Sequence, residues 1–91
     1  MAIQISLPTV LAKLADDQRV ITGEGATLGD AVADVATRYP RLAPRLRDEA
    51  GNPYPYVLFY LNDADIRLTG GFASAVRDGD EVTIVPAIAG G

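Results

Sequence analysis

Apolar and polar residues alternate near the N-terminus of the chain. Residues 2–7 place two isoleucines and a leucine on one face, and Pro8 ends this segment because proline cannot donate a ladder hydrogen bond. Residues 19–22 are rich in β-branched side chains, and we interpret Gly23-Glu24-Gly25 after them as a turn. The pattern predicts a β-hairpin whose strands are joined by a loop around residues 16–17.

A helical pattern follows. Thr27 is a suitable N-cap, and Asp30 stands at the spacing of a capping box and near the positive end of the helix dipole. Pro40 stops the pattern. The apolar positions with helical spacing are Leu28, Val32, Val35 and Tyr39.

Residues 41–54 combine prolines, a glycine and charges, which indicates a short turn of helix and a loop. In this segment only Leu42 and Leu46 are expected to pack. Strands are predicted over residues 56–61 and 81–85, with a shorter one over 65–68. The residues expected to face the core in these strands are Val57, Phe59, Leu61, Val82 and Ile84.

The resulting order is strand, strand, helix, strand, short strand, strand. It predicts an α+β, β-grasp (ubiquitin-like) fold, with a mixed sheet of four to five strands, one main helix across it, and parallel first and last strands. A chain of 91 residues is long enough for one domain only. We expect this domain to span residues 1–86 and residues 87–91 to form a flexible C-terminal tail.

Charge and composition narrow the range of functions. The net charge of −4 disfavours a nucleic-acid partner, because it opposes attraction to phosphates. There is no apolar segment of the roughly 18 residues that a membrane span needs, so no membrane partner is expected. Residues 1–5 lack a secretory pattern, which predicts a cytoplasmic protein.

The chain contains no Cys and no His, which removes thiol nucleophiles, imidazole bases and the usual zinc ligands. Asp63 and Asp65 could be considered as an acid/base pair or as metal ligands, but in a turn such residues usually form local hydrogen bonds. We therefore predict no catalytic residue and no metal site.

The chain ends in Gly90-Gly91. One interpretation is a frayed terminus. The other is a delivery arm, because glycine lacks a Cβ and lets the backbone enter a narrow channel. Residues 87–91 span at most about 18 Å when extended, and Ile88 is their one large apolar side chain.

Several segments resemble those of the ubiquitin-like sulfur carriers (MoaD/ThiS-like proteins). They are residues 60–67, Gly70-Gly71, residues 78–86 and the ending Ala87-Ile88-Ala89-Gly90-Gly91. The helix start Thr27-Leu28-Gly29-Asp30 also fits, so the resemblance covers nearly the whole chain. It looks closest to the actinobacterial carriers of cysteine biosynthesis.

The resemblance implies a carrier and not an enzyme. An E1-like adenylating enzyme would use ATP to activate the Gly91 carboxylate, and a sulfur source would displace AMP to leave a thiocarboxylate. A sulfur-accepting synthase would then receive the sulfur for cysteine, molybdopterin, thiamine or a specialised metabolite. The carrier would bind no cofactor itself, and would present Ala87, Ile88, Ala89 and Gly90 to the active sites of these partners.

Partner docking is expected on the exposed face of the sheet near the tail, at Leu58, Tyr60 and Val85, with Phe72 as either a docking anchor or a core residue. Alternatively, residues 41–54 partly cover Leu58 and Tyr60. Two other functions share the fold. One is a ubiquitin-like modifier joined through Gly91 to lysines of target proteins, and the other is a non-covalent interaction module whose tail has no role.

Overall fold

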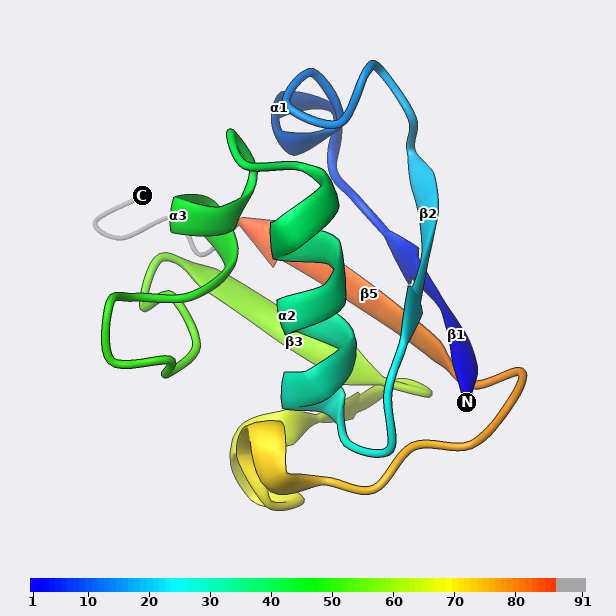
Figure 1. Ribbon diagram of the computed structural model, residues 1–91. Helices are drawn as coiled ribbons and strands as arrows, with labels where there is room; N and C mark the ends of the chain where they lie inside the picture. The colour runs from blue at the N-terminus through cyan, green and yellow to red at the C-terminus, as the bar shows by residue number, and fades with distance from the viewer. Residues whose placement is uncertain (87–91) are drawn as a thin grey trace.

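The computed structural model describes residues 1–86, which form a five-stranded sheet with the strand order β2-β1-β5-β3-β4. The strands are β1 (Ala2–Ser6), β2 (Val20–Glu24), β3 (Val57–Leu61), β4 (Ala64–Asp65) and β5 (Glu81–Pro86). The helices are α1 (Thr9–Ala12), α2 (Leu28–Arg38), α3 (Ala43–Leu46) and two 3-10 turns, η1 (Ile66–Leu68) and η2 (Gly71–Ala73). β1 and β5 are parallel and the other neighbours are antiparallel, with α2 lying across one face (Figure 1). The predicted β-grasp fold is confirmed.

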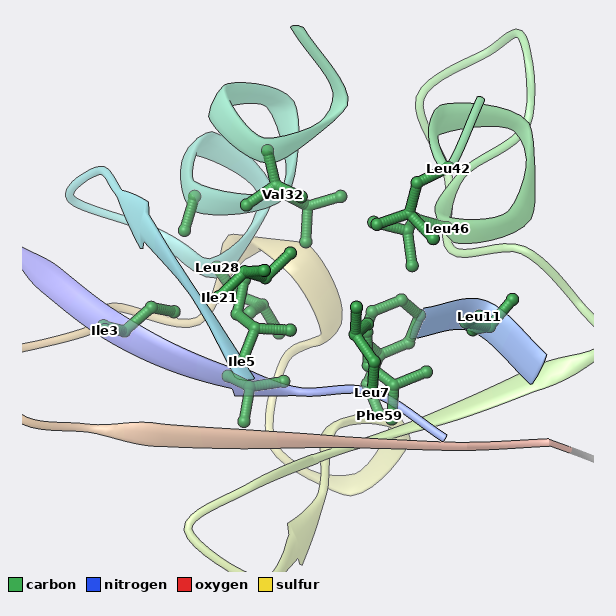
Figure 2. Close-up of a cluster of buried hydrophobic side chains, with 14 of the residues drawn as sticks. Ile3, Ile5, Leu7, Leu11, Ile21, Leu28, Val32, Leu42, Leu46 and Phe59 are labelled. Carbon is green, nitrogen blue, oxygen red and sulfur yellow. The ribbon is translucent and has the colours of Figure 1, made fainter. Parts of the chain in front are cut away.

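The core lies between α2 and one face of the sheet (Figure 2). The alternation of β1, β3 and β5 sends every second side chain into it, as predicted. Leu42 and Leu46 are fully buried, which confirms their expected packing. The largest side chains with almost no exposed surface are Phe59, Ile3, Ile5, Leu28, Leu42, Leu46 and Ile66.

The helix α2 begins as predicted. The Thr27 hydroxyl oxygen accepts a hydrogen bond from the Asp30 backbone N–H at 3.2 Å, which satisfies one of the free donors of the first turn. The polar side of the helix also holds the neighbouring strand, because Asp34 accepts from the Glu24 backbone N–H at 3.0 Å. Arg38 donates to the Thr22 carbonyl and pairs with Asp34.

The prediction of a turn at Gly23-Glu24-Gly25 is wrong for its first two residues. Gly23 and Glu24 belong to β2, with Gly23 opposite Ile3, and the chain leaves the strand at Gly25. A Cβ on Gly23 would lie 2.8 Å from the Ala31 carbonyl oxygen. Glycine is needed here because α2 packs against the backbone of β2, and no turn is involved.

Two further elements differ from the predictions. The expected strand over residues 65–68 is reduced to Ala64–Asp65, because Asp65 accepts from the Arg67 backbone N–H at 2.9 Å and starts η1. Helix α1 was not predicted at all: its four residues are too few for a helical period, and Leu11 and Ala12 are buried.

The predicted tail, residues 87–91, lies outside the described residues, so the division of the chain into a domain over residues 1–86 and a tail stays a prediction. Within the described part, no helix is long and apolar enough to cross a membrane.

Candidate functional site

The strand that leads to the C-terminal segment is held at the centre of the sheet. β5 is hydrogen-bonded to β1 over its first residues and to β3 along its length, and Val82 and Ile84 are buried. Its last residue, Pro86, lies opposite Val57. The point at which the chain continues towards Gly91 is therefore fixed by the fold. The predicted site residues Ala87, Ile88, Ala89, Gly90 and Gly91 lie outside the described residues.

The face of the sheet away from α2 carries three of the four predicted docking residues. Leu58 lies directly opposite Val85, and Tyr60 lies opposite Thr83. Val85 is 36% exposed, and Leu58 and Tyr60 are half-buried. The three side chains occupy adjacent positions on two neighbouring strands, next to Pro86. We call Leu58, Tyr60 and Val85 the open-face patch.

The structure separates Phe72 from this patch. Its ring packs edge to face against Phe59, with 5.2 Å between the ring centroids, and Phe59 points into the core. A Cβ on Gly29 of α2 would lie 3.1 Å from the Phe72 Cβ, so Phe72 sits beside the helix. Of the two predicted roles, the structure favours core packing, because Phe72 lies on the α2 side of the sheet.

The segment of residues 41–54 also lies on the α2 side. Leu42 and Leu46 anchor it in the core, and α3 packs beside α2 (Figure 1). The end of the segment still reaches the neighbourhood of Leu58, because Pro53 and Tyr54 line a hollow together with it.

A second surface borders Pro86, on the α2 side. It is an open hollow of about 390 Å³ between α1, α3 and the start of β3. Its lining includes Val10, Leu14, Arg45, Tyr54, Tyr56 and Pro86, and we call it the exit hollow. Sequence reasoning missed it because its walls come from four distant segments. The one local indication was the pair of aromatic residues Tyr54 and Tyr56, where the predicted loop of residues 41–54 gives way to the predicted strand of residues 56–61.

The carboxylates considered for chemistry have structural roles. The Asp65 carboxylate pairs with the Arg67 guanidinium at 2.6 Å, and this hydrogen bonding lowers the pKa of Asp65 and raises the pKa of Arg67. Asp63 occupies a left-handed turn position with φ 71°. Among residues 1–86, no group of three Cys, His, Asp or Glu side chains gathers closely enough to hold a metal ion.

The start of β5 is also held by a carboxylate. Asp80 accepts from the Arg77 backbone N–H at 2.9 Å and from the Asn62 amide at 3.1 Å. Both hydrogen bonds lower the pKa of Asp80, and the bond from the Arg77 backbone has the larger effect. Asn62 in turn accepts from the Glu81 backbone N–H at 3.0 Å, so the turn before β5 is tied to the β3–β4 hairpin.

Known proteins resemble this chain over its whole length. A model of the ThiS family matches residues 5–91. The sulfur carrier protein CysO of Mycobacterium tuberculosis is 40% identical over 93 aligned positions, covering 100% of both chains. The crystal structure of that protein has a TM-score of 0.86 at 38% identity, covering 94% of this chain and 99% of the other.

Two further relatives bear on partners and on alternatives. A chain of the BexX/CysO complex of Amycolatopsis orientalis has a TM-score of 0.87 at 35% identity, covering 98% of this chain and 99% of that one. Small archaeal modifier protein 3 of Haloferax volcanii is 35% identical over 68 residues, covering 75% of this chain and 73% of that protein.

Proposed function

The chain belongs to the ThiS family, and from this premise we propose that it is a sulfur carrier whose Gly91 carboxylate becomes a thiocarboxylate. The observation that carries the proposal is that the family match runs to residue 91, so that Gly90 and Gly91 lie inside it. The full-length identity with a protein named as a sulfur carrier supports the same conclusion.

In the proposed cycle, an oxygen of the Gly91 carboxylate attacks the α-phosphorus of ATP on an E1-like adenylating enzyme. Pyrophosphate leaves and an acyl adenylate forms. A sulfide-equivalent donor then attacks the carbonyl carbon, AMP leaves, and a thiocarboxylate remains. A sulfur-accepting synthase takes up this sulfur, for cysteine, molybdopterin, thiamine or a specialised metabolite. The carrier binds no cofactor, and the ATP is a substrate of the adenylating enzyme.

The body of the protein contributes position and not chemistry. Because Pro86 is paired with Val57 in the sheet, the segment that follows starts from a defined point. The absence of Cys means that no side chain of the carrier competes as a thiol for the activated carbonyl. The complex of BexX with CysO is a precedent for a partner protein bound to a relative of this chain.

Mass spectrometry tests the proposal. The full chain is incubated with the adenylating enzyme, ATP and sulfide, and the intact mass is expected to increase by the replacement of one oxygen with sulfur. Fragmentation should place this change in the C-terminal peptide, and deletion of Gly91 should abolish it. An unchanged mass, or a change elsewhere in the chain, would overturn the proposal.

The relative named as a modifier supports a second candidate, in which a target lysine attacks the same adenylate. The product would be an isopeptide between Gly91 and the lysine Nζ. Peptides of other proteins that carry the terminal residues of this chain on lysine would favour it. An interaction module, by contrast, would keep its function when Gly91 is deleted.

A further inference from the structure

The exit hollow lies next to the residue from which the C-terminal segment continues, on the side of the sheet opposite the open-face patch. We propose that it is a docking site for the adenylating enzyme, which inserts an apolar side chain flanked by a carboxylate. This inference rests on the proposed function. It adds a recognition surface for one partner.

The reach of the C-terminal segment places this surface inside the interface. The five residues after Pro86 extend at most about 18 Å, so an enzyme that holds Gly91 must approach the body near Pro86. A stable interface buries about 800 Å² on each partner, which is about 15% of the 5328 Å² surface here. An interface of that size next to Pro86 takes in surfaces that adjoin it, and the exit hollow is one of them.

The walls of the exit hollow have the character of a docking surface. Val10 is 63% exposed and Tyr56 is 58% exposed, although both are large and apolar. Tyr54 packs edge to face against Tyr56, with 5.4 Å between the ring centroids and 67° between the planes. This contact orients the Tyr56 ring before a partner binds, which lowers the entropic cost of docking.

Arg45 gives the exit hollow a charge preference. Its side chain is exposed on α3, and the ion pairs within residues 1–86 are Arg38 with Asp34 and Arg67 with Asp65. The chain as a whole carries a net charge of −4. A carboxylate on the partner is therefore attracted at Arg45 against a body that is negatively charged overall, which favours one orientation of the complex. Tyrosine and arginine are also the residue types that dominate binding energy at interfaces.

The chemistry of the first step favours the adenylating enzyme as the occupant. That enzyme acts on an ordinary terminal carboxylate, a group that every protein chain has. It must therefore select its substrate by the body of the carrier. The second enzyme receives a thiocarboxylate, which already distinguishes the loaded carrier from other proteins.

Exchange of labelled pyrophosphate into ATP measures this step with the full chain as substrate. Tyr56→Ala and Val10→Ser are expected to raise KM for the carrier by about ten-fold or more with kcat unchanged, because they remove binding that is equal in the ground and transition states. Raising the salt concentration should raise KM for the wild type more than for Arg45→Gln.

Leu68→Ser is the matched control, because Leu68 is an apolar residue that is 85% exposed and lies far from the exit hollow. Leu68 follows β4, which pairs with the C-terminal end of β3, whereas Pro86 pairs with the first residue of β3. Its KM should equal that of the wild type, and urea unfolding should confirm that all variants fold.

The possible outcomes separate the inference from the proposed function. If the wild type supports no exchange, the proposed function fails. If the wild type is active and both hollow variants keep its KM, the inference alone is overturned. A KM below that of the wild type would indicate that the hollow holds the carrier's own C-terminal segment, and would also overturn it. The inference would also be overturned if sedimentation equilibrium showed a dimer of the wild type that Tyr56→Ala dissociates, because the hollow would then bind a second copy of the chain.

Discussion

The substitution Gly23→Ala tests how closely α2 is packed against the sheet. The added Cβ would lie 2.8 Å from the Ala31 carbonyl oxygen and 3.1 Å from side-chain carbons of both Ile5 and Val35. The first contact is with backbone, so the helix itself must move. Overpacking of this kind costs about 1–3 kcal/mol. Replacing a glycine within a strand returns about 0.5–1 kcal/mol through the lower entropy of the unfolded chain.

Because the contact is with backbone, the cost should lie in the upper half of its range, and the expected net loss is then about 1–2 kcal/mol in the free energy of unfolding, measured from the urea midpoint at constant m-value. For a domain of this size it corresponds to a fall in Tm of about 5–15 °C. Glu24→Ala, at the next and exposed position of β2, should change the free energy by no more than about 0.5 kcal/mol. A Gly23→Ala variant as stable as the wild type would refute the reasoning. KM in pyrophosphate exchange should not change, because Gly23 is two strands away from β5.

Three further predictions concern other parts of the fold. Phe72→Ala should lower the free energy of unfolding by about 1–3 kcal/mol, because it removes the contact with Phe59. The loss is smaller than for a fully buried ring, since Phe72 is half-buried, and unchanged urea unfolding would contradict its core role. Val85→Thr keeps a β-branched side chain, so Tm should be nearly unchanged. The substitution removes apolar surface from the open-face patch, so KM for the carrier in pyrophosphate exchange should rise, and an unchanged KM would count against docking at this patch. Since hydrogen bonds lower the pKa of Asp80, its stabilising contribution is complete above the unfolded value of about 3.9 and is lost as the pH falls through the lower folded value. Between pH 6 and pH 2, Tm should therefore fall less for Asp80→Asn than for the wild type, and parallel curves would contradict this.

Much of the fold could be predicted because it follows from patterns among residues that are close in sequence. The alternation in residues 2–7 and 81–85 determines which side chains of β1 and β5 face the core. The Thr27 cap and the stripe of Leu28 and Val32 define α2 without reference to the rest of the chain. The terminal glycines likewise indicated a candidate delivery arm from local sequence alone, while the chemistry proposed for Gly91 came from the resemblance to the sulfur carriers.

Other features could not be predicted because they depend on contacts between distant segments. Gly23 has the sequence signature of a turn residue, yet it is required by the backbone of α2. Phe72 looked equally suited to the surface and to the core, and its contact with Phe59 decided between them. Asp65 ends its strand early because its carboxylate caps the next turn and pairs with Arg67.

By itself, then, the sequence determined the order of the elements, the inward faces of the strands and the candidate terminus, because each follows from residue types at short and regular spacing. Only the tertiary structure decided which surfaces adjoin Pro86. The open-face patch comes from the register between β3 and β5, and the exit hollow from α1, α3 and the start of β3. Register and packing arise from contacts across the whole chain, and no local pattern records them.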